Sequence, residues 1–227
     1  MEGAHPLYTK DFRKKCNHIP VAREGIPYIA AAMFTTLITA ILGWSVITIL
    51  FLAVTLLVGH FFRDPERVSI AGDREIISPA DGKVIAVRKV PSTRFTDRPS
   101  RKISIFMSVF DVHVNRAPIS GTVRGIFYKK GGFVPADHAE AGEKNEQNWL
   151  WVRSDSGIDV ILTQVAGLIA RRIVCWPGLG DQVNQAERFG MIRFGSRMDV
   201  YVPEDVEIQV SIGQHVYAGE TVLCRLK

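Results

Sequence analysis

The sequence has few cysteines and no metal-binding or disulfide pattern. The three cysteines, Cys16, Cys175 and Cys224, are an odd number, lie far apart and include no C-x-x-C pair. Disulfide frameworks and structural zinc sites both need closely spaced cysteines. We therefore expect a reducing compartment and no metal site.

A nucleic-acid-binding pattern is also missing, although the formal net charge is +5. No stripe of arginine and lysine interleaved with aromatic residues occurs, and no nucleic-acid motif stands out. An anionic membrane surface explains the positive charge more simply. We expect a membrane, and no nucleic acid, as a partner.

Asp, Glu, Lys and Arg are absent from one long stretch, residues 25–62. One helix of that length would reach about 57 Å, whereas the hydrocarbon core of a bilayer is about 30 Å thick. Gly43-Trp44-Ser45 is the natural break, and it leaves two apolar pieces, roughly residues 28–42 and 46–59. The stretch predicts a helical membrane anchor, either a hairpin or one tilted helix with an interfacial extension.

Basic residues flank this anchor on both sides, which favours the hairpin. They are Lys14, Lys15 and Arg23 before it and Arg63 and Arg67 after it. The positive-inside rule would keep both ends cytoplasmic. The apolar run is too long and starts too late for a cleaved signal peptide, and a buried soluble helix pair is the remaining alternative. We expect a basic cytoplasmic segment (1–24), an anchor in the cell inner membrane (25–62) and a cytoplasmic domain (63–227).

The region after Phe62 consists of short strand patterns separated by Gly, Pro, Asp and Asn turns. This predicts a mainly β, barrel-sandwich-like domain with little helix. Residues 164–172 fit a short helix or a strand equally well. The expected strands are 83–90, 102–114, 121–128, 148–154, 158–165, 171–175, 190–202 and, in the tail, 206–226.

The predicted strand 190–202 carries an unusual serine. Apolar residues occupy its even positions and charged residues its odd ones, which indicates a half-buried strand with Ser196 on the apolar face, directly after Gly195. A buried hydroxyl needs a partner. A structural role, as a core serine beside a bulge glycine, is enough to explain these residues. The alternative hypothesis is that Ser196 is a nucleophile.

Asp81 and His113 could complete a catalytic group with Ser196. Asp81 lies in an Asp-Gly turn, and His113 ends an apolar strand on which Asp111, His113 and Asn115 share one face. A turn cap and a structural histidine are the ordinary explanations. The three residue types nevertheless suit a nucleophile, a base and an orienting carboxylate. The second glycine of G-x-S-x-G is missing, which disfavours an ordinary serine hydrolase.

Three segments, in this order, resemble the phosphatidylserine decarboxylases in their short form with an apolar N-terminal anchor. The order and spacing make the match specific, and it covers essentially the whole chain after the membrane segment. The segments are Ser78-Pro79-Ala80-Asp81-Gly82, Phe106-Met107-Ser108 with Asp111-Val112-His113-Val114-Asn115-Arg116-Ala117-Pro118, and Phe194-Gly195-Ser196-Arg197-Met198-Asp199.

This resemblance implies a self-processing enzyme with a covalent pyruvoyl cofactor. Ser196, with His113 as its base and Asp81 orienting the ring, would attack the Gly195 carbonyl, which a side chain at position 195 would obstruct. The cut would leave a β chain (1–195) and an α chain (196–227) that begins with the pyruvoyl group. That group would form a Schiff base with phosphatidylserine and yield phosphatidylethanolamine.

The resemblance also suggests contacts to the anionic phospholipid substrate. Arg116, Arg193 and Arg197 are candidates for the phosphate, although a solvated basic face explains the last two as well, and Phe194 and Met198 would keep the site apolar. Longer family members have a second histidine where Arg116 stands, so His113 would serve both maturation and catalysis. Whether the protein forms a homodimer stays open.

One non-enzymatic alternative is a membrane-anchored lipoyl- or biotinyl-like adaptor module. Residues 213–222 resemble the hairpins of such carriers, and the segment from Pro79 to Val84 is a weak echo of them. No lysine stands at the tip of that hairpin, and no heptad run suggests the coiled coil that adaptors usually carry. The enzyme is therefore the favoured hypothesis.

Overall fold

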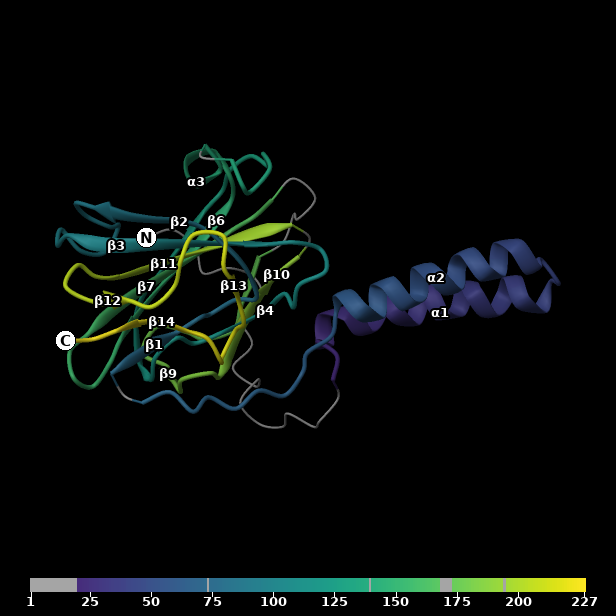
Figure 1. The fold of residues 1–227 in the computed structure, drawn as a ribbon. Helices are drawn as coiled ribbons and strands as arrows, with labels where there is room; N and C mark the ends of the chain where they lie inside the picture. Colours follow the sequence, from purple (N-terminus) through teal and green to yellow (C-terminus); the bar gives the residue numbers. More distant parts are fainter. Residues whose placement is uncertain (1–19, 73, 139, 168–172, 194) are drawn as a thin grey trace. The chain divides into compact units, whose positions relative to one another are not determined.

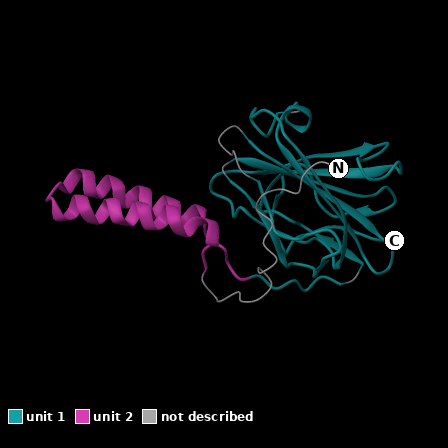
Figure 2. Ribbon diagram, turned by 180° about the vertical axis from the view of Figure 1, so that it is seen from behind, with its two compact units in different colours: residues 1–15, 67–227 teal, residues 16–66 magenta. Residues whose placement is uncertain are grey.

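In the computed structural model, residues 20–72, 74–138, 140–167, 173–193 and 195–227 are described. They fall into two compact units, one within Cys16–Glu66 and the other within Arg67–Lys227 (Figure 2). The first is helical and the second is built mainly of strands.

The first unit is a hairpin of two apolar helices, α1 (Ile26–Ile41) and α2 (Ser45–Phe61) (Figure 1). Gly43 lies between them with a φ of 70°, in the left-handed region that glycine adopts without strain. The hydroxyls of Thr36 and Thr55 are 3.0 Å apart and link the two helices. The two helices are thus separated between Ile41 and Ser45, next to the break that the sequence indicates.

The helices keep their apolar side chains on the outside. Ile41, Val46 and Ile49 are 72%, 82% and 68% exposed, which is the pattern of a lipid-facing rather than a water-facing surface. By length and composition the helical stretch Arg23–Ile41 is long and apolar enough to cross a membrane. The structure therefore provides an N-terminal membrane-anchor candidate, as the sequence predicts.

The second unit is mainly β, which confirms the predicted fold class. Its largest sheet is curled and has the strand order β13-β2-β3-β11-β7-β6-β5-β9, and two three-stranded sheets have the orders β4-β10-β8 and β1-β14-β12. One short helix, α3 (Ala141–Lys144), was not expected. The strands are β1 (Glu75–Ile77), β2 (Gly82–Val90), β3 (Ser100–Met107), β4 (Val114–Arg116), β5 (Gly121–Lys129), β6 (Gln147–Arg153), β7 (Asp159–Val165), β8 (Ile173–Cys175), β9 (Gln182–Val183), β10 (Arg188–Ile192), β11 (Ser196–Pro203), β12 (Glu207–Ile208), β13 (His215–Val216) and β14 (Val222–Arg225).

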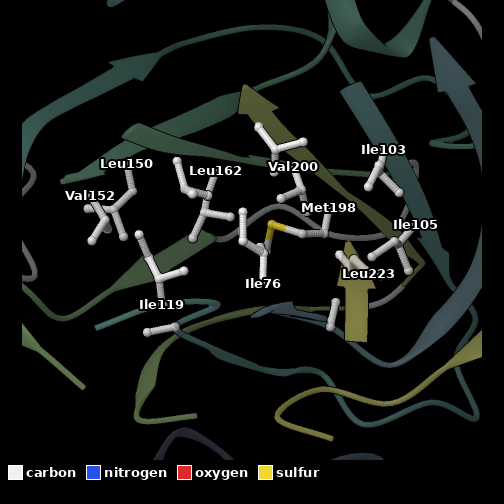
Figure 3. Close-up of a cluster of buried hydrophobic side chains, with 14 of the residues drawn as sticks. Ile76, Ile103, Ile105, Ile119, Leu150, Val152, Leu162, Met198, Val200 and Leu223 are labelled. Carbon is white, nitrogen blue, oxygen red and sulfur yellow. The ribbon is translucent and has the colours of Figure 1, made fainter. Parts of the chain in front are cut away.

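One apolar core holds these sheets together. Met198 and Val200 of β11 project into it among Ile105, Leu162 and Leu223, which come from three other strands (Figure 3). All five side chains have no exposed surface. Since large-to-small changes in such a core cost about 2–5 kcal/mol, β11 is fixed firmly at the centre of the domain.

The predicted strand 102–114 is wrong as one element. It is two strands, because the chain leaves β3 at Met107, turns at residues 108–111 and enters β4, in another sheet, at Val114. The Asp111 carboxylate stabilises the turn by accepting bonds from the Ser108 backbone N–H and hydroxyl, both at 2.7 Å. Asp111 and His113 therefore do not share a strand face with Asn115.

The predicted strand 190–202 is divided in the same way. It becomes β10 and β11, which belong to different sheets. The expected half-buried face is also wrong, because Arg197 and Asp199 are only 4% and 1% exposed. They pair with each other inside the protein, so both faces of β11 are covered. Of the ambiguous segment 164–172, residues 164 and 165 belong to β7, and residues 168–172 lie outside the described residues.

Candidate active site

His113, just before β4, and Ser196, at the start of β11, lie at one corner where the chain passes from one sheet to another. On one side of the corner Ser196 is paired with Met107, in the β11–β3 ladder. On the other side Met191 is paired with Val114, and the Ile192 N–H donates to the His113 carbonyl at 3.4 Å. Strands that change sheets commonly form such corners. The fold thus brings together two residues that are far apart in the sequence.

Ser196 is the first residue of β11 and has no exposed surface. Its hydroxyl contacts the thioether sulfur of Met107 at 3.4 Å. A thioether is a weak acceptor, so this contact holds the hydroxyl in place while stabilising it less than an oxygen partner would. The serine is therefore buried but only weakly satisfied, which suits a nucleophile better than a structural core serine.

Gly195 has a backbone conformation that favours glycine. Its φ is 54°, in the left-handed region that side chains disfavour, yet a Cβ at this position would have nothing within 4 Å. Whether a side chain at position 195 would obstruct the approach of Ser196 itself stays a prediction. The crowded position is Gly167, where a Cβ would overlap the Gly195 carbonyl oxygen and lie 2.7 Å from its carbon. Gly167 lets the backbone pass directly against the bond that is proposed to break.

His113 is completely buried, and its Nδ1 lies 2.9 Å from the carbonyl oxygen of Asp111. A carbonyl can only accept, so we assign the proton of the neutral ring to Nδ1. Nε2 then carries the lone pair and is the basic nitrogen. A backbone carbonyl therefore fixes the tautomer, which is the task that the sequence assigns to Asp81.

Asp81 is held by a different partner. Its Oδ1 and Oδ2 accept from Arg67 Nη1 and Nη2 at 2.8 and 2.7 Å, and Oδ1 also accepts from the Ala218 N–H at 2.8 Å. The Arg67 and Asp81 side chains are only 8% and 5% exposed. In this structure the carboxylate secures the start of the β unit to the turn at Ala218, and its part in orienting His113 stays a prediction.

This buried ion pair predicts a large loss of stability when one partner is removed. Arg67→Ala should lower the free energy of unfolding by about 3–5 kcal/mol, because it leaves a charged carboxylate buried without its partner. Arg67→Ala combined with Asp81→Ala should lose less. Urea unfolding of the full chain in detergent, followed by tryptophan fluorescence, measures both.

Arg153→Ala is the matched control for this prediction. Arg153 also donates two hydrogen bonds to an aspartate, from Nε and Nη2 to the Asp159 carboxylate at 2.7 and 2.8 Å. The Arg153 side chain, however, is 41% exposed. Water can replace an exposed partner, so this variant should lose much less stability. Equal losses in Arg67→Ala and Arg153→Ala would contradict the structural role assigned to Asp81.

A chain of buried amides supports the corner behind Ser196. Gln164 Nε2 donates to Asn115 Oδ1 at 2.9 Å, and Asn148 Nδ2 donates to Gln164 Oε1 at 3.0 Å. Asn115 Nδ2 lies 3.9 Å from the Met107 sulfur that the Ser196 hydroxyl contacts. Asn115, Gln164 and Asn148 are at most 4% exposed. Buried polar groups that satisfy one another make an arrangement specific, so this chain fixes the sulfur and the serine.

The candidate substrate residues have varied surroundings. Arg197 is engaged inside the protein by the carbonyls of Ala136 and His138, both at 3.1 Å, and by Asp199, so a solvated basic face is wrong for it. Arg116 is 4% exposed and donates to the Ala186 carbonyl at 3.0 Å. Of the three remaining candidates, Arg193 is partly buried and Met198 is part of the apolar core. Phe194 lies outside the described residues.

Sequence reasoning missed three residues near the corner. Arg67 resembles an ordinary flank of the anchor, and its bond to Ala218 joins positions 151 residues apart, which no local pattern indicates. His215 lies in a segment with turn residues on both sides, yet its Nε2 lies 2.9 Å from Asp111 Oδ1. Gly167 had one usable signal, since a glycine directly after a buried apolar strand often marks a close backbone approach.

Comparison with known proteins adds independent information. The family model described as phosphatidylserine decarboxylase matches residues 54–224. The curated phosphatidylserine decarboxylase proenzyme of Syntrophotalea carbinolica is 50% identical over 208 residues, which are 92% of this chain and 97% of that protein. Proteins with the same name from Geotalea uraniireducens and Desulfotalea psychrophila are both 48% identical, over 90% of this chain and 95% and 96% of their own lengths.

Proposed function

Because the chain belongs to the phosphatidylserine decarboxylase family, we propose that this decarboxylase is made as a precursor that cuts itself between Gly195 and Ser196. The observation that carries the proposal is the corner itself. A buried, weakly bonded serine follows a glycine in the left-handed conformation, and a histidine with a basic Nε2 stands at the same corner. The curated relatives are named proenzymes, which agrees with processing.

The first step is an acyl shift. His113 Nε2 takes the hydroxyl proton of Ser196, and Oγ forms a bond with the Gly195 carbonyl carbon. The bond from that carbon to the Ser196 nitrogen then breaks, the nitrogen takes up a proton, and an ester remains. Gly167 supports this step, because its missing side chain leaves room beside the Gly195 carbonyl.

The second step is an elimination. A base removes the Cα proton of residue 196, the Cβ–Oγ bond breaks, and Gly195 leaves as the carboxylate at the end of the β chain. The dehydroalanine left behind takes up water and releases ammonia, which gives the pyruvoyl ketone. Pairing of β11 with β3 and β7 on the α-chain side of the cut would keep the two chains together.

The residues around position 196 fit such a group. Ser196 has no exposed surface and lies against Met107, so the ketone, once formed, would have an apolar setting that little water can reach. A pyruvoyl ketone at this position would supply an electrophile for the substrate amine and a sink for the electron pair that loss of CO2 releases. A dry site favours loss of CO2 from a carboxylate. We assign the return of a proton to the α carbon to His113, and the product is then phosphatidylethanolamine.

The apolar hairpin supports a membrane location. We propose that it holds the β unit at the cytoplasmic face of the inner membrane, where basic flanks would retain it. Tethering raises the effective concentration of a lipid substrate without any contact to the reacting group.

A decarboxylation assay tests this function. The purified full chain in mixed micelles should release labelled CO2 from phosphatidylserine that carries the label in its serine carboxylate, and it should form phosphatidylethanolamine in equal amount. Pretreatment with phenylhydrazine, which condenses with ketones, should abolish the release. Decarboxylation that persists after this treatment would contradict a ketone cofactor, and no CO2 release by cleaved enzyme would contradict the assigned reaction.

A further inference from the structure

One exposed apolar surface lies beside the corner, and the mechanism does not use it. Val109 and Phe110 form the tip of the turn that leads to His113 and are 37% and 66% exposed. Ile212 and Tyr217, in the segment around β13, are 66% and 48% exposed. We call these four residues the docking patch.

The two halves of the docking patch are joined by Asp111. Its Oδ1 lies 2.9 Å from His215 Nε2, and its Oδ2 accepts two bonds from Ser108 at the base of the turn. The His215 ring in turn packs on Tyr217, with ring centroids 5.0 Å apart. These contacts fix the positions of the two segments that carry the apolar side chains of the docking patch.

The docking patch adjoins the residue that holds His113 in place. The carbonyl of Asp111, the residue after Phe110, is the group that binds His113 Nδ1. A surface that binds Phe110 would therefore be close to His113, which is only three residues further along the chain. Two basic side chains border the patch, because His215 and Lys83 are exposed and paired across β13 and β2.

We propose that the docking patch inserts into the surface of an anionic phospholipid bilayer, as a second membrane contact besides the helical anchor. Apolar and aromatic tips next to basic side chains are the composition of interfacial membrane contacts. Four apolar side chains are too few for a stable protein interface, which needs about 20–30 residues on each side.

The short connection between the helical anchor and the β unit also supports a lipid bilayer as the surface that the docking patch contacts. Arg67 follows the end of α2 at Phe61 by six residues, which span about 20 Å when fully extended. Its guanidinium lies 5.8 Å from the centroid of the Tyr217 ring in the docking patch. With the anchor in a bilayer, this short connection keeps Tyr217 close to the lipid. The proposal rests on the proposed function, since the contact would present lipid headgroups to the site.

The test compares two forms of the substrate with the full-length, cleaved enzyme in vesicles. Phe110→Asp should lower decarboxylation of long-chain phosphatidylserine in the bilayer by about tenfold or more, because a charge on the tip opposes insertion. Decarboxylation of a water-soluble dihexanoyl phosphatidylserine should stay unchanged. Leu179→Asp is the matched control, since Leu179 is 71% exposed but precedes β9, at the opposite edge of the large sheet from β13. It should leave both activities unchanged.

A label measures insertion without relying on activity. In a Cys16→Ser background, Phe110→Cys would carry an environment-sensitive fluorophore. Loss of hydration raises the pKa of the Cys175 and Cys224 thiols to about 12, so neither should react at neutral pH. Spin labels on the lipid acyl chains should quench the fluorophore at position 110 but not one at Leu179→Cys.

The outcomes separate this proposal from the proposed function. Full bilayer activity of Phe110→Asp, an equal loss on both substrates, or no quenching at position 110 would overturn the docking patch as a membrane contact. Wild-type enzyme that decarboxylates neither substrate would instead overturn the proposed function.

Discussion

Ser196→Ala should give one uncut chain of 25.3 kDa with no decarboxylase activity. Alanine has no oxygen to attack the Gly195 carbonyl, and it cannot become a pyruvoyl group by elimination. The serine is fully buried and its hydroxyl makes only a weak contact, with the Met107 thioether, so its removal should leave the fold intact. Denaturing electrophoresis and CO2 release measure both effects, and the activity should fall to the uncatalysed background.

Ser104→Ala is the control for this variant. Ser104 is also a buried serine, at 4% exposure, but it lies in the interior of β3 opposite Asp199, away from the corner. This variant should cleave itself and remain active. An active, uncut Ser196→Ala protein would refute the pyruvoyl mechanism, whereas loss of cleavage in both variants would show that the fold rather than the nucleophile had been damaged.

His113→Ala should slow self-cleavage on the order of 10²- to 10⁴-fold, the usual contribution of a positioned base. The precursor should accumulate and be visible by electrophoresis over a time course after synthesis. Added imidazole should restore part of the cleavage, since it can enter the space that the ring leaves and take the serine proton. A variant that had merely failed to fold would not respond to imidazole.

His138→Ala is the matched control for His113→Ala. His138 is exposed, and its bond to Arg197 is made by its backbone carbonyl, not by its ring. Removing its ring should leave the cleavage rate unchanged. Cleavage of His113→Ala at the wild-type rate would show that another group is the base.

Local patterns in the sequence predict most of the fold. The strands β5, β6 and β7 lie within one residue of the predicted segments 121–128, 148–154 and 158–165, because alternation and turn residues mark both of their ends. The helical break at Gly43 is equally local, since a glycine interrupts an apolar run. These elements depend on neighbouring residues, which a sequence displays directly.

The corner could not be predicted from periodicity. Ile192 at the end of β10 and Met198 in β11 both occupy even positions and are both fully buried, so the alternation of the sequence does not reveal that the two strands belong to different sheets. The resemblance identified Ser196 and His113 as partners, but the groups around Ser196 come from distant parts of the chain. The sulfur that its hydroxyl contacts belongs to Met107, 89 residues away, and the supporting amide chain joins Asn115 to Gln164, 49 residues apart.

The intact masses of the purified wild-type protein under denaturing conditions test the central claim most directly. A 25.3 kDa chain of 227 residues has a mean residue mass of about 111 Da, so residues 196–227 should appear as a fragment of about 3.6 kDa beside a β chain of about 21.7 kDa. The small fragment should be lighter by one ammonia than a peptide that begins with serine, and it should resist Edman degradation. A single uncut mass in fully active protein, or a fragment that begins with free serine, would contradict the account.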